Sequence, residues 1–212
     1  MTTQNFPNYE EGIIFLKRQD KQLAWLIEQI GYLTHTDTKD DFLFLLEQII
    51  GQMLSIKVAD VMLERLTDIC GGIVTVESIN QLDIETLRNI GISNRKAVCI
   101  KEIAQMIANG SLDFRTLKAL PDNQLIKCLT TIKGIGSWTA KMYLYKIHRP
   151  DVLPYEDATF LSAYKWLYQT QEIRPAAIKQ HCKKWSPYLS IAAMYLYAAF
   201  ERKLLQTEVP KY

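Results

Sequence analysis

Apolar residues recur at spacings of three and four along most of the chain, which is the periodicity of an α-helix that packs by one face. No stretch alternates apolar and polar residues as a half-buried β-strand would. The pattern predicts helices over residues 13–31, 42–54, 58–70, 84–90, 95–108, 122–131, 138–147, 159–168, 175–185 and 190–205. The fold class predicted from the sequence is therefore all-α.

Glycine and proline residues separate the predicted helices, as expected of helix ends. Residues 149–154, Arg-Pro-Asp-Val-Leu-Pro, cannot continue a helix, because each proline lacks an N–H and disfavours α geometry in the residue before it. This extended segment leads to Glu156 and Asp157, where a new helical periodicity begins. We expect one or both carboxylates at a helix amino terminus, where aspartate is a favoured cap.

Composition and charge narrow the class of protein. The chain has 212 residues, of which 48% are hydrophobic and 23% charged, so it can bury a large core. Residues 1–120 hold 12 Lys and Arg against 16 Asp and Glu, whereas residues 121–212 hold 13 against 7. A basic excess in one half suits a polyanionic partner. We expect an intracellular protein, because no basic-then-apolar leader is present and no apolar run is long enough to span a bilayer.

Cysteine and histidine residues are scattered along the sequence rather than clustered. Because the four cysteines are far apart, we expect small buried hydrophobic side chains rather than ligands of zinc or of an iron–sulfur cluster. We expect His35, His148 and His181 to be surface or capping residues.

A glycine turn lies between the predicted helices 122–131 and 138–147. It reads Lys133-Gly134-Ile135-Gly136, and Ser-Trp-Thr-Ala opens the next helix. Glycines at a helix amino terminus leave backbone N–H groups free to bind a phosphate, and a nearby lysine adds charge. Since glycine is also common in ordinary helix turns, the pair alone is weak evidence. The glycine turn combined with Pro-x-x-Asp after an extended segment is a more specific pattern.

Together these residues resemble the helix-hairpin-helix superfamily of base-excision DNA glycosylases, and most closely its 3-methyladenine DNA glycosylase II branch. Gly134 to Ala140 resembles that branch's Gly-Ile-Gly-x-Trp-Thr-Ala string, and Asp157 falls where its catalytic aspartate does. Residues 49–55 are similar to a helix end with Gly-Gln-x-x-Ser, from which a bulky side chain enters the duplex; here that residue is Met53. Residues 91–97 resemble its Gly-x-Ser-x-x-Lys-Ala turn.

The resemblance implies two helical lobes, with residues 40–147 as a helical barrel that ends in the hairpin. Residues 1–39 and 148–212 form the second lobe, with Asp157 in the cleft. It also implies hydrolysis of the N-glycosidic bond of alkylated purines, with Asp157 as the catalytic group and Glu156 as the rival carboxylate. Aromatic residues suit a cationic base, and our candidates for the base pocket are Trp138, Trp185 and Tyr188. The candidates for DNA binding are Gln52, Met53, Lys133, Gly134, Gly136 and Lys141.

One departure from the superfamily pattern bears on mechanism. Members that also cut the backbone have a lysine after the hairpin, whose amine forms a Schiff base with the sugar; here the residue is Trp138. We therefore expect a monofunctional enzyme that uses water. Leu189 stands where the branch often has arginine, which leaves the lesion open.

The same resemblance implies the partners and cofactors. The partner is double-stranded DNA with damaged bases, and we expect a monomer with no membrane association. No cofactor is required, no iron–sulfur cluster is expected, and a structural Na⁺ or K⁺ at the hairpin is implied by the family alone. The protein would be cytoplasmic and nucleoid-associated in a bacterium, or nuclear in a eukaryote. Two other functions stay open: a non-catalytic DNA-binding module, and the same fold acting on deaminated or oxidised bases.

Overall fold

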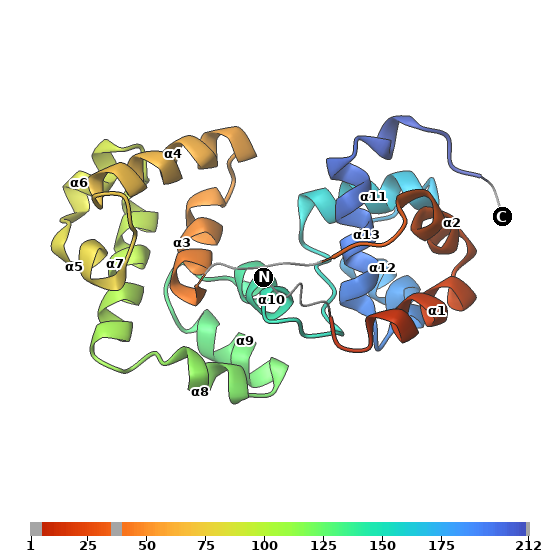
Figure 1. Ribbon diagram of the computed structural model, residues 1–212, viewed down its shortest axis with the longest axis horizontal. Helices are drawn as coiled ribbons and strands as arrows, with labels where there is room; N and C mark the ends of the chain where they lie inside the picture. Colours follow the sequence, from red (N-terminus) through yellow and green to blue (C-terminus); the bar gives the residue numbers. More distant parts are fainter. Residues whose placement is uncertain (1–5, 35–39, 211–212) are drawn as a thin grey trace. The chain divides into compact units, whose positions relative to one another are not determined.

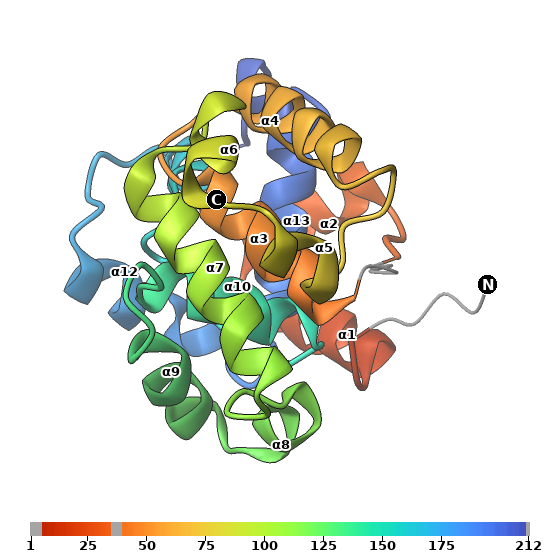
Figure 2. The ribbon, with the colours of Figure 1, turned by 90° about the vertical axis from the view of Figure 1, so that its left-hand side faces the viewer.

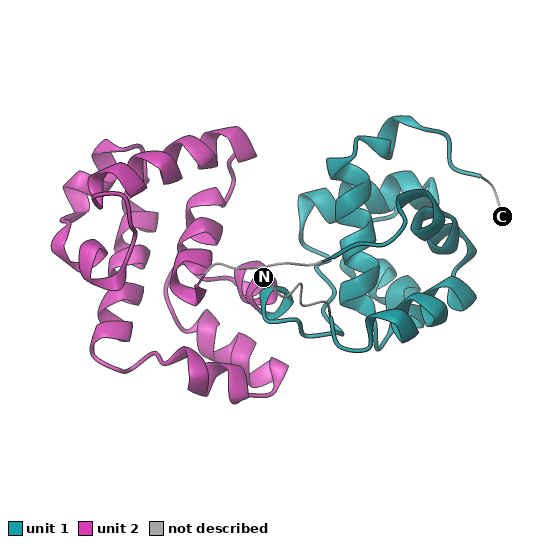
Figure 3. Cartoon of the chain, viewed as in Figure 1, with its two compact units in different colours: residues 1–37, 144–212 teal, residues 38–143 magenta. Residues whose placement is uncertain are grey.

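The structure is a computed structural model that describes residues 6–34 and 40–210. Within these ranges every regular element is a helix, which confirms the predicted all-α class (Figure 1). The chain divides into two compact units, residues 1–37 with 144–212 (unit 1) and residues 38–143 (unit 2) (Figure 3). The lobes expected from the sequence were residues 40–147 and the remainder of the chain.

Unit 1 is built around one apolar helix, α13 (Leu189–Glu201), in which nine of the 13 residues are buried. A helix that is apolar on nearly every side must be surrounded, and α13 contacts α1 (Tyr9–Gln19), α2 (Lys21–Ile30) and α11 (Ala158–Tyr168). The unit is completed by α12 (Pro175–Cys182) and the short 3₁₀ helices η1 (Lys183–Trp185) and η2 (Leu204–Gln206). The core of unit 1 therefore unites the two ends of the chain.

Unit 2 is arranged around α7 (Asn94–Ala108), which contacts α3 (Asp41–Gly51), α5 (Val76–Gln81) and α6 (Ile84–Asn89) (Figure 2). The unit also contains α4 (Ile56–Ile69), α8 (Phe114–Ala119) and α9 (Asp122–Thr130). Helix α10 (Ser137–Lys146) begins in unit 2 and ends in unit 1. Among the residues of α7, Ile100, Ile103 and Ala104 are fully buried, so this helix supplies much of the unit's core.

The structure divides or shortens several predicted helices. Segment 13–31 breaks at Asp20, whose backbone is extended and whose carboxylate accepts from the N–H of Leu23, so that α2 begins anew. Segment 175–185 ends as a 3₁₀ turn, and segment 190–205 breaks after Glu201. Helices α5 and α8 were not predicted, because six residues are too few to establish a periodicity.

Candidate functional site

Buried side chains anchor the glycine turn between α9 and α10 on its inner side. Ile132 and Ile135 are both almost fully buried, and the N–H of Ile135 donates to the carbonyl of Ile132 at 3.0 Å. Gly134 has a φ of +112°, a region that favours glycine, and a Cβ there would lie 2.9 Å from Cys99 Sγ. The turn thus requires glycine at position 134 for both conformation and space.

The outer side of the same turn is open. Gly136 is exposed, and a Cβ built on it would meet nothing within 4 Å. Within the part of the chain that the structure describes, the N–H groups of Gly134 and Gly136 donate to no protein acceptor. Lys133 is exposed beside them, and Lys141 is half-buried one turn into α10. Free N–H donors and a cation at a helix amino terminus form a suitable anion site.

Met53 lies in an unusual position directly after α3. Its side chain is fully exposed, with a relative accessibility of 102%, and its φ of +59° places a non-glycine residue in the left-handed region. Met53 is therefore not part of the hydrophobic core. A large apolar side chain held in water on a strained backbone serves no packing purpose in the free protein.

Gln52, the residue before Met53, joins three parts of unit 2. Its side-chain Nε2 donates to the carbonyl of Gly134 at 3.1 Å and to Oγ1 of Thr139 at 3.2 Å. Its own carbonyl accepts from Lys96 Nζ at 2.8 Å. We call these four residues the Gln52 junction. Gln52 was predicted to contact DNA, but its amide nitrogen donates inside the protein.

Sequence reasoning missed Lys96. The residue belongs to the Gly-x-Ser-x-x-Lys-Ala string, but only the structure shows what its ammonium group contacts. The group is half-buried, and burial lowers the pKa of Lys96 below its usual value. Cys99, whose side chain leaves no room for a Cβ at position 134, was also not predicted, because no sequence pattern indicated which residue packs against the turn.

Asp157 caps α11, as predicted for one or both carboxylates. Its Oδ1 accepts from the N–H of Phe160 at 2.8 Å, and its own N–H donates to the carbonyl of Pro154 at 2.9 Å. The side chain is half-buried, whereas the rival Glu156 is exposed and is not the cap. Burial raises the pKa of Tyr197 well above its usual value, and the nearby charge of Asp157 raises it further.

The three aromatic candidates have different surroundings. Trp138 is half-buried in the first turn of α10. Tyr188 is half-buried in unit 1, with its ring centroid 5.4 Å from that of Phe15. Trp185 has no exposed surface, and its Nε1 donates to Asp20 Oδ2 at 2.9 Å. Trp185 is thus a core residue of unit 1 in this structure, with no ring face open to a base, and we do not retain it as a pocket residue.

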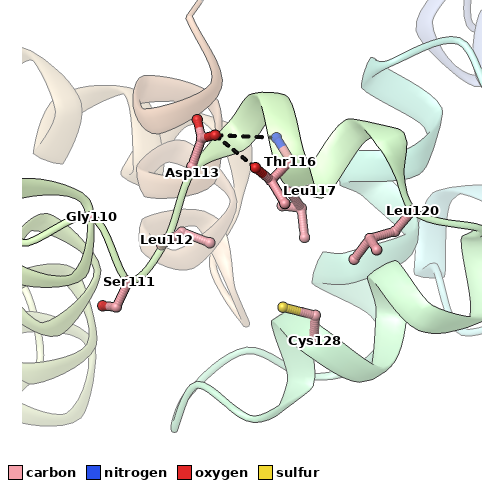
Figure 4. Close-up of a pocket in the computed structure, with 8 residues that line it drawn as sticks. All are labelled: Gly110, Ser111, Leu112, Asp113, Thr116, Leu117, Leu120 and Cys128. Carbon is pink, nitrogen blue, oxygen red and sulfur yellow. Dashed lines mark hydrogen bonds between the residues drawn. The ribbon is translucent and has the colours of Figure 1, made fainter.

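A separate cavity of about 150 Å³ lies in unit 2 between α8, α9 and the end of α7 (Figure 4). It contains none of the predicted site residues. Its lining residues are Gly110, Ser111, Leu112, Asp113, Thr116, Leu117, Leu120 and Cys128. The Asp113 carboxylate there is occupied with the Thr116 hydroxyl and N–H, so it serves to cap α8.

The cysteines and histidines show no sign of shared chemistry. Cys99 and Cys182 are buried as predicted, and burial raises the pKa of Cys99 to about 11; the prediction is wrong for Cys128, which is exposed. His181 Nδ1 lies 2.8 Å from the Tyr164 hydroxyl, and His35 lies outside the described residues. Across residues 6–34 and 40–210, no cluster of three or more His, Cys, Asp or Glu could hold a metal ion.

Comparison of the chain with known proteins identifies its family. A model of the HhH-GPD superfamily of base excision DNA repair proteins matches residues 46–187, which contain the Gln52 junction, the hairpin and Asp157. The chain belongs to this superfamily. The HhH-GPD membership confirms the family that the sequence motifs indicated.

Individual HhH-GPD relatives extend the likeness over most of the chain. DNA-3-methyladenine glycosylase 1 of Schizosaccharomyces pombe is 31% identical over 182 residues, which are 84% of this chain and 80% of the relative. The S. pombe enzyme Mag1, solved in complex with abasic DNA, matches with a TM-score of 0.81 and 28% identity over 90% of this chain and 97% of its own. A DNA-3-methyladenine glycosidase of Bacillus halodurans gives a TM-score of 0.78 and 32% identity, covering 92% and 91%.

No helix among the described residues of this HhH-GPD protein has both the length and the apolar character needed to cross a membrane.

Proposed function

We propose that this protein is a monofunctional DNA glycosylase that hydrolyses the N-glycosidic bond of alkylated purines, of the 3-methyladenine type, in double-stranded DNA. The family supports base excision repair, and the similar proteins named above are 3-methyladenine glycosylases. The observation that carries the proposal is Met53, an exposed apolar side chain whose turn is tied to the phosphate-binding hairpin through Gln52. Such a side chain is suited to fill the space that an extruded nucleotide leaves.

The first step is the extrusion of the damaged nucleotide. The free N–H groups of Gly134 and Gly136, with Lys133, bind a backbone phosphate beside the lesion. Met53 enters the duplex, and the nucleotide swings out at an unstacking cost of a few kcal/mol, which is lower for a damaged base. Trp138 and Tyr188 are the remaining candidates for stacking on the cationic base.

The second step is hydrolysis at the sugar. An alkylated purine is already a cationic leaving group, so the bond between the base nitrogen and C1′ breaks as positive charge develops on the sugar. Asp157 stabilises that charge and accepts a proton from the attacking water, whose oxygen bonds to C1′. The products are the free base and an abasic site. One Asp157 oxygen is fixed by the N–H of Phe160, which sets the orientation of the other.

A structural Na⁺ or K⁺ at the hairpin is part of this proposal and rests on the family alone. Hard cations prefer carbonyl oxygens. The Gly134 carbonyl is already used by Gln52, but those of Thr131, Lys133 and Ile135 accept no hydrogen bond from the described residues and would supply the ligands. The cation would help to bind the phosphate. We further propose that the protein acts as a monomer, without a redox cofactor, wherever the cell's DNA lies.

Replacing Asp157 with asparagine tests the catalytic assignment. Asparagine is as good a helix cap as aspartate, so Asp157→Asn removes the charge and keeps α11 intact. We expect release of methylated purines to fall by about a thousandfold or more, while affinity for duplex DNA stays close to that of the parent. Asp83→Asn is the matched control, because Asp83 caps α6 in the same way through the N–H of Thr86. Release near the parent rate by Asp157→Asn would overturn the assignment.

Assays on the same DNA substrates distinguish the proposed function from two alternatives. A non-catalytic DNA-binding module would bind methylated duplexes and produce no abasic sites. A glycosylase for deaminated or oxidised bases would release hypoxanthine, uracil or 8-oxoguanine from a panel of defined duplexes faster than 3-methyladenine. Leu189, which lies at the start of α13 in place of the branch's arginine, is the feature that makes this panel necessary.

A further inference from the structure

Two lysines of α7 cap the carboxyl ends of other helices in unit 2. Lys96 Nζ lies 2.8 Å from the carbonyl oxygen of Ile50 and 2.8 Å from that of Gln52, at the end of α3. Lys101 Nζ lies 3.0, 2.9 and 2.6 Å from three carbonyl oxygens at the end of α5. Carbonyls at a helix carboxyl end carry partial negative charge, so an ammonium group there is stabilising.

The two caps differ in what they hold. Helix α5, capped by Lys101, leads to the short helix α6 and to none of the candidate site residues. The Lys96 cap ends at Gln52, whose side chain reaches the hairpin at Gly134 and Thr139 and whose next residue is Met53. Among the described residues, Lys96 Nζ donates to the carbonyls of Ile50 and Gln52 and not to Met53 or the hairpin, so its effect passes through Gln52.

We infer that Lys96 is a positioning residue for base extrusion. Together with the Gln52 side chain, it fixes Met53 in its left-handed turn at a set distance from the glycine hairpin, so that Met53 enters the duplex beside the phosphate that the hairpin binds. This inference rests on the proposed function, since it assigns Lys96 to the extrusion step of that reaction.

The physical argument concerns the cost of the Met53 backbone. A non-glycine residue at positive φ is disfavoured, and the turn persists only if its surroundings hold it. The surroundings here are two charge-assisted bonds from Lys96 and two bonds from Gln52 Nε2. Without the ammonium group the turn relaxes, and Met53 explores positions that do not match the gap in the duplex. Binding to intact DNA does not require that match.

The test combines Lys96→Met with Met53→Ala in a double-mutant cycle. Methionine keeps the length of the lysine chain and removes its charge. We measure single-turnover release of methylated purine, the fluorescence of 2-aminopurine next to the lesion as a probe of extrusion, affinity for undamaged duplex, and the thermal midpoint. Lys101→Met is the matched control, because Lys101 also lies on α7 and caps the carboxyl end of a different helix, α5.

We expect Lys96→Met to lower release by about tenfold to a hundredfold and to weaken the fluorescence change. Affinity for undamaged DNA should stay within about twofold of the parent. In the Met53→Ala background, Lys96→Met should lower release by no more than about twofold, because the side chain that Lys96 positions is already absent. Lys101→Met should lower the thermal midpoint as much as Lys96→Met and leave release near the parent rate.

Three results would overturn the inference: an undiminished loss in the Met53→Ala background, an equal loss of release in Lys101→Met, or parent-like extrusion in Lys96→Met. If Lys96→Met does not fold, Lys96→Gln, which can still donate to one carbonyl, takes its place in the same cycle. A parent protein that releases no methylated base would count against the proposed function instead, so the two failures are distinguishable.

Discussion

The Cα of Gly134 faces the side chain of Cys99 so closely that a Cβ at position 134 would lie 2.9 Å from Sγ and 3.0 Å from Cβ of Cys99. The φ of +112° would strain any other residue there. We predict that Gly134→Ala destabilises the protein by about 3 kcal/mol through overpacking and backbone strain. Urea denaturation measures the loss, and affinity for duplex DNA should fall with it because the hairpin is deformed.

Gly136→Ala separates the two roles of the hairpin glycines. Its Cβ would meet nothing within 4 Å, so the free energy of unfolding should stay within about 0.5 kcal/mol of the parent. The added methyl group lies on the open side of the turn, where a phosphate approaches. We predict that DNA affinity falls about tenfold, as if one charge-assisted hydrogen bond were lost. A Gly136→Ala protein with parent-like affinity would show that the phosphate does not bind at this turn.

The sequence predicted the parts of the site that depend on local chemistry. The glycine turn and the cap at Asp157 follow from backbone rules that act over a few residues, and the structure has both. The exposed Met53 was predicted only by the resemblance, because periodicity alone would have placed it at the end of an amphipathic helix.

Contacts between distant segments could not be predicted in this way. Trp185 was expected in a base pocket, but its partner Asp20 is 165 residues away, and no local pattern shows that this carboxylate is buried. Lys96 reaches Gln52 across 44 residues, and Cys99 meets the hairpin only after α7 is packed. Helices divided by one residue, as at Asp20, are hidden because the apolar spacing continues across the break.

Lys133 provides a test of phosphate binding by the hairpin. Neutralising one phosphate contact lowers the slope of log affinity against log salt concentration by about 0.9 for duplex DNA. We predict this change for Lys133→Gln, because Lys133 is exposed next to the free N–H groups. Lys127→Gln, an exposed lysine of α9 in the same unit, is the control and should leave the slope unchanged. Equal slopes for the two variants would contradict the assignment.

The residue after the hairpin predicts how the reaction ends. Trp138 has no amine, so no Schiff base with the sugar can form at that position. We predict that borohydride traps no covalent complex with the parent protein during base release. Strands should break only after alkali treatment of the abasic product. A trapped complex would indicate an amine in the reaction, and Lys133→Gln and Lys141→Gln variants would then identify which one.

Asp20 predicts how stability depends on pH. Burial alone would raise the pKa of this carboxyl group, but Lys184 Nζ at 2.9 Å, the N–H of Leu23, Trp185 Nε1 and the Tyr168 hydroxyl at 2.8 Å outweigh it, so the pKa lies below its usual value. A group whose pKa is lower in the folded state stabilises the fold above its unfolded pKa of about 3.9 and loses that contribution as pH falls through the folded pKa.

We therefore predict that Asp20→Asn lowers stability by about 2 kcal/mol at pH 6 to 7, because the amide carries no charge and replaces one of the two acceptor oxygens with an NH₂ group. The difference from the parent should be constant down to about pH 5 and should narrow below about pH 4, where the parent's carboxylate also becomes protonated. Thermal melts of both proteins across this range give the measurement. Tyr168→Phe removes one donor and should move the parent's acid transition to higher pH, since the pKa of Asp20 then lies closer to its usual value. If the difference in stability between Asp20→Asn and the parent stayed constant through the acid range, the charge of Asp20 would contribute nothing to stability.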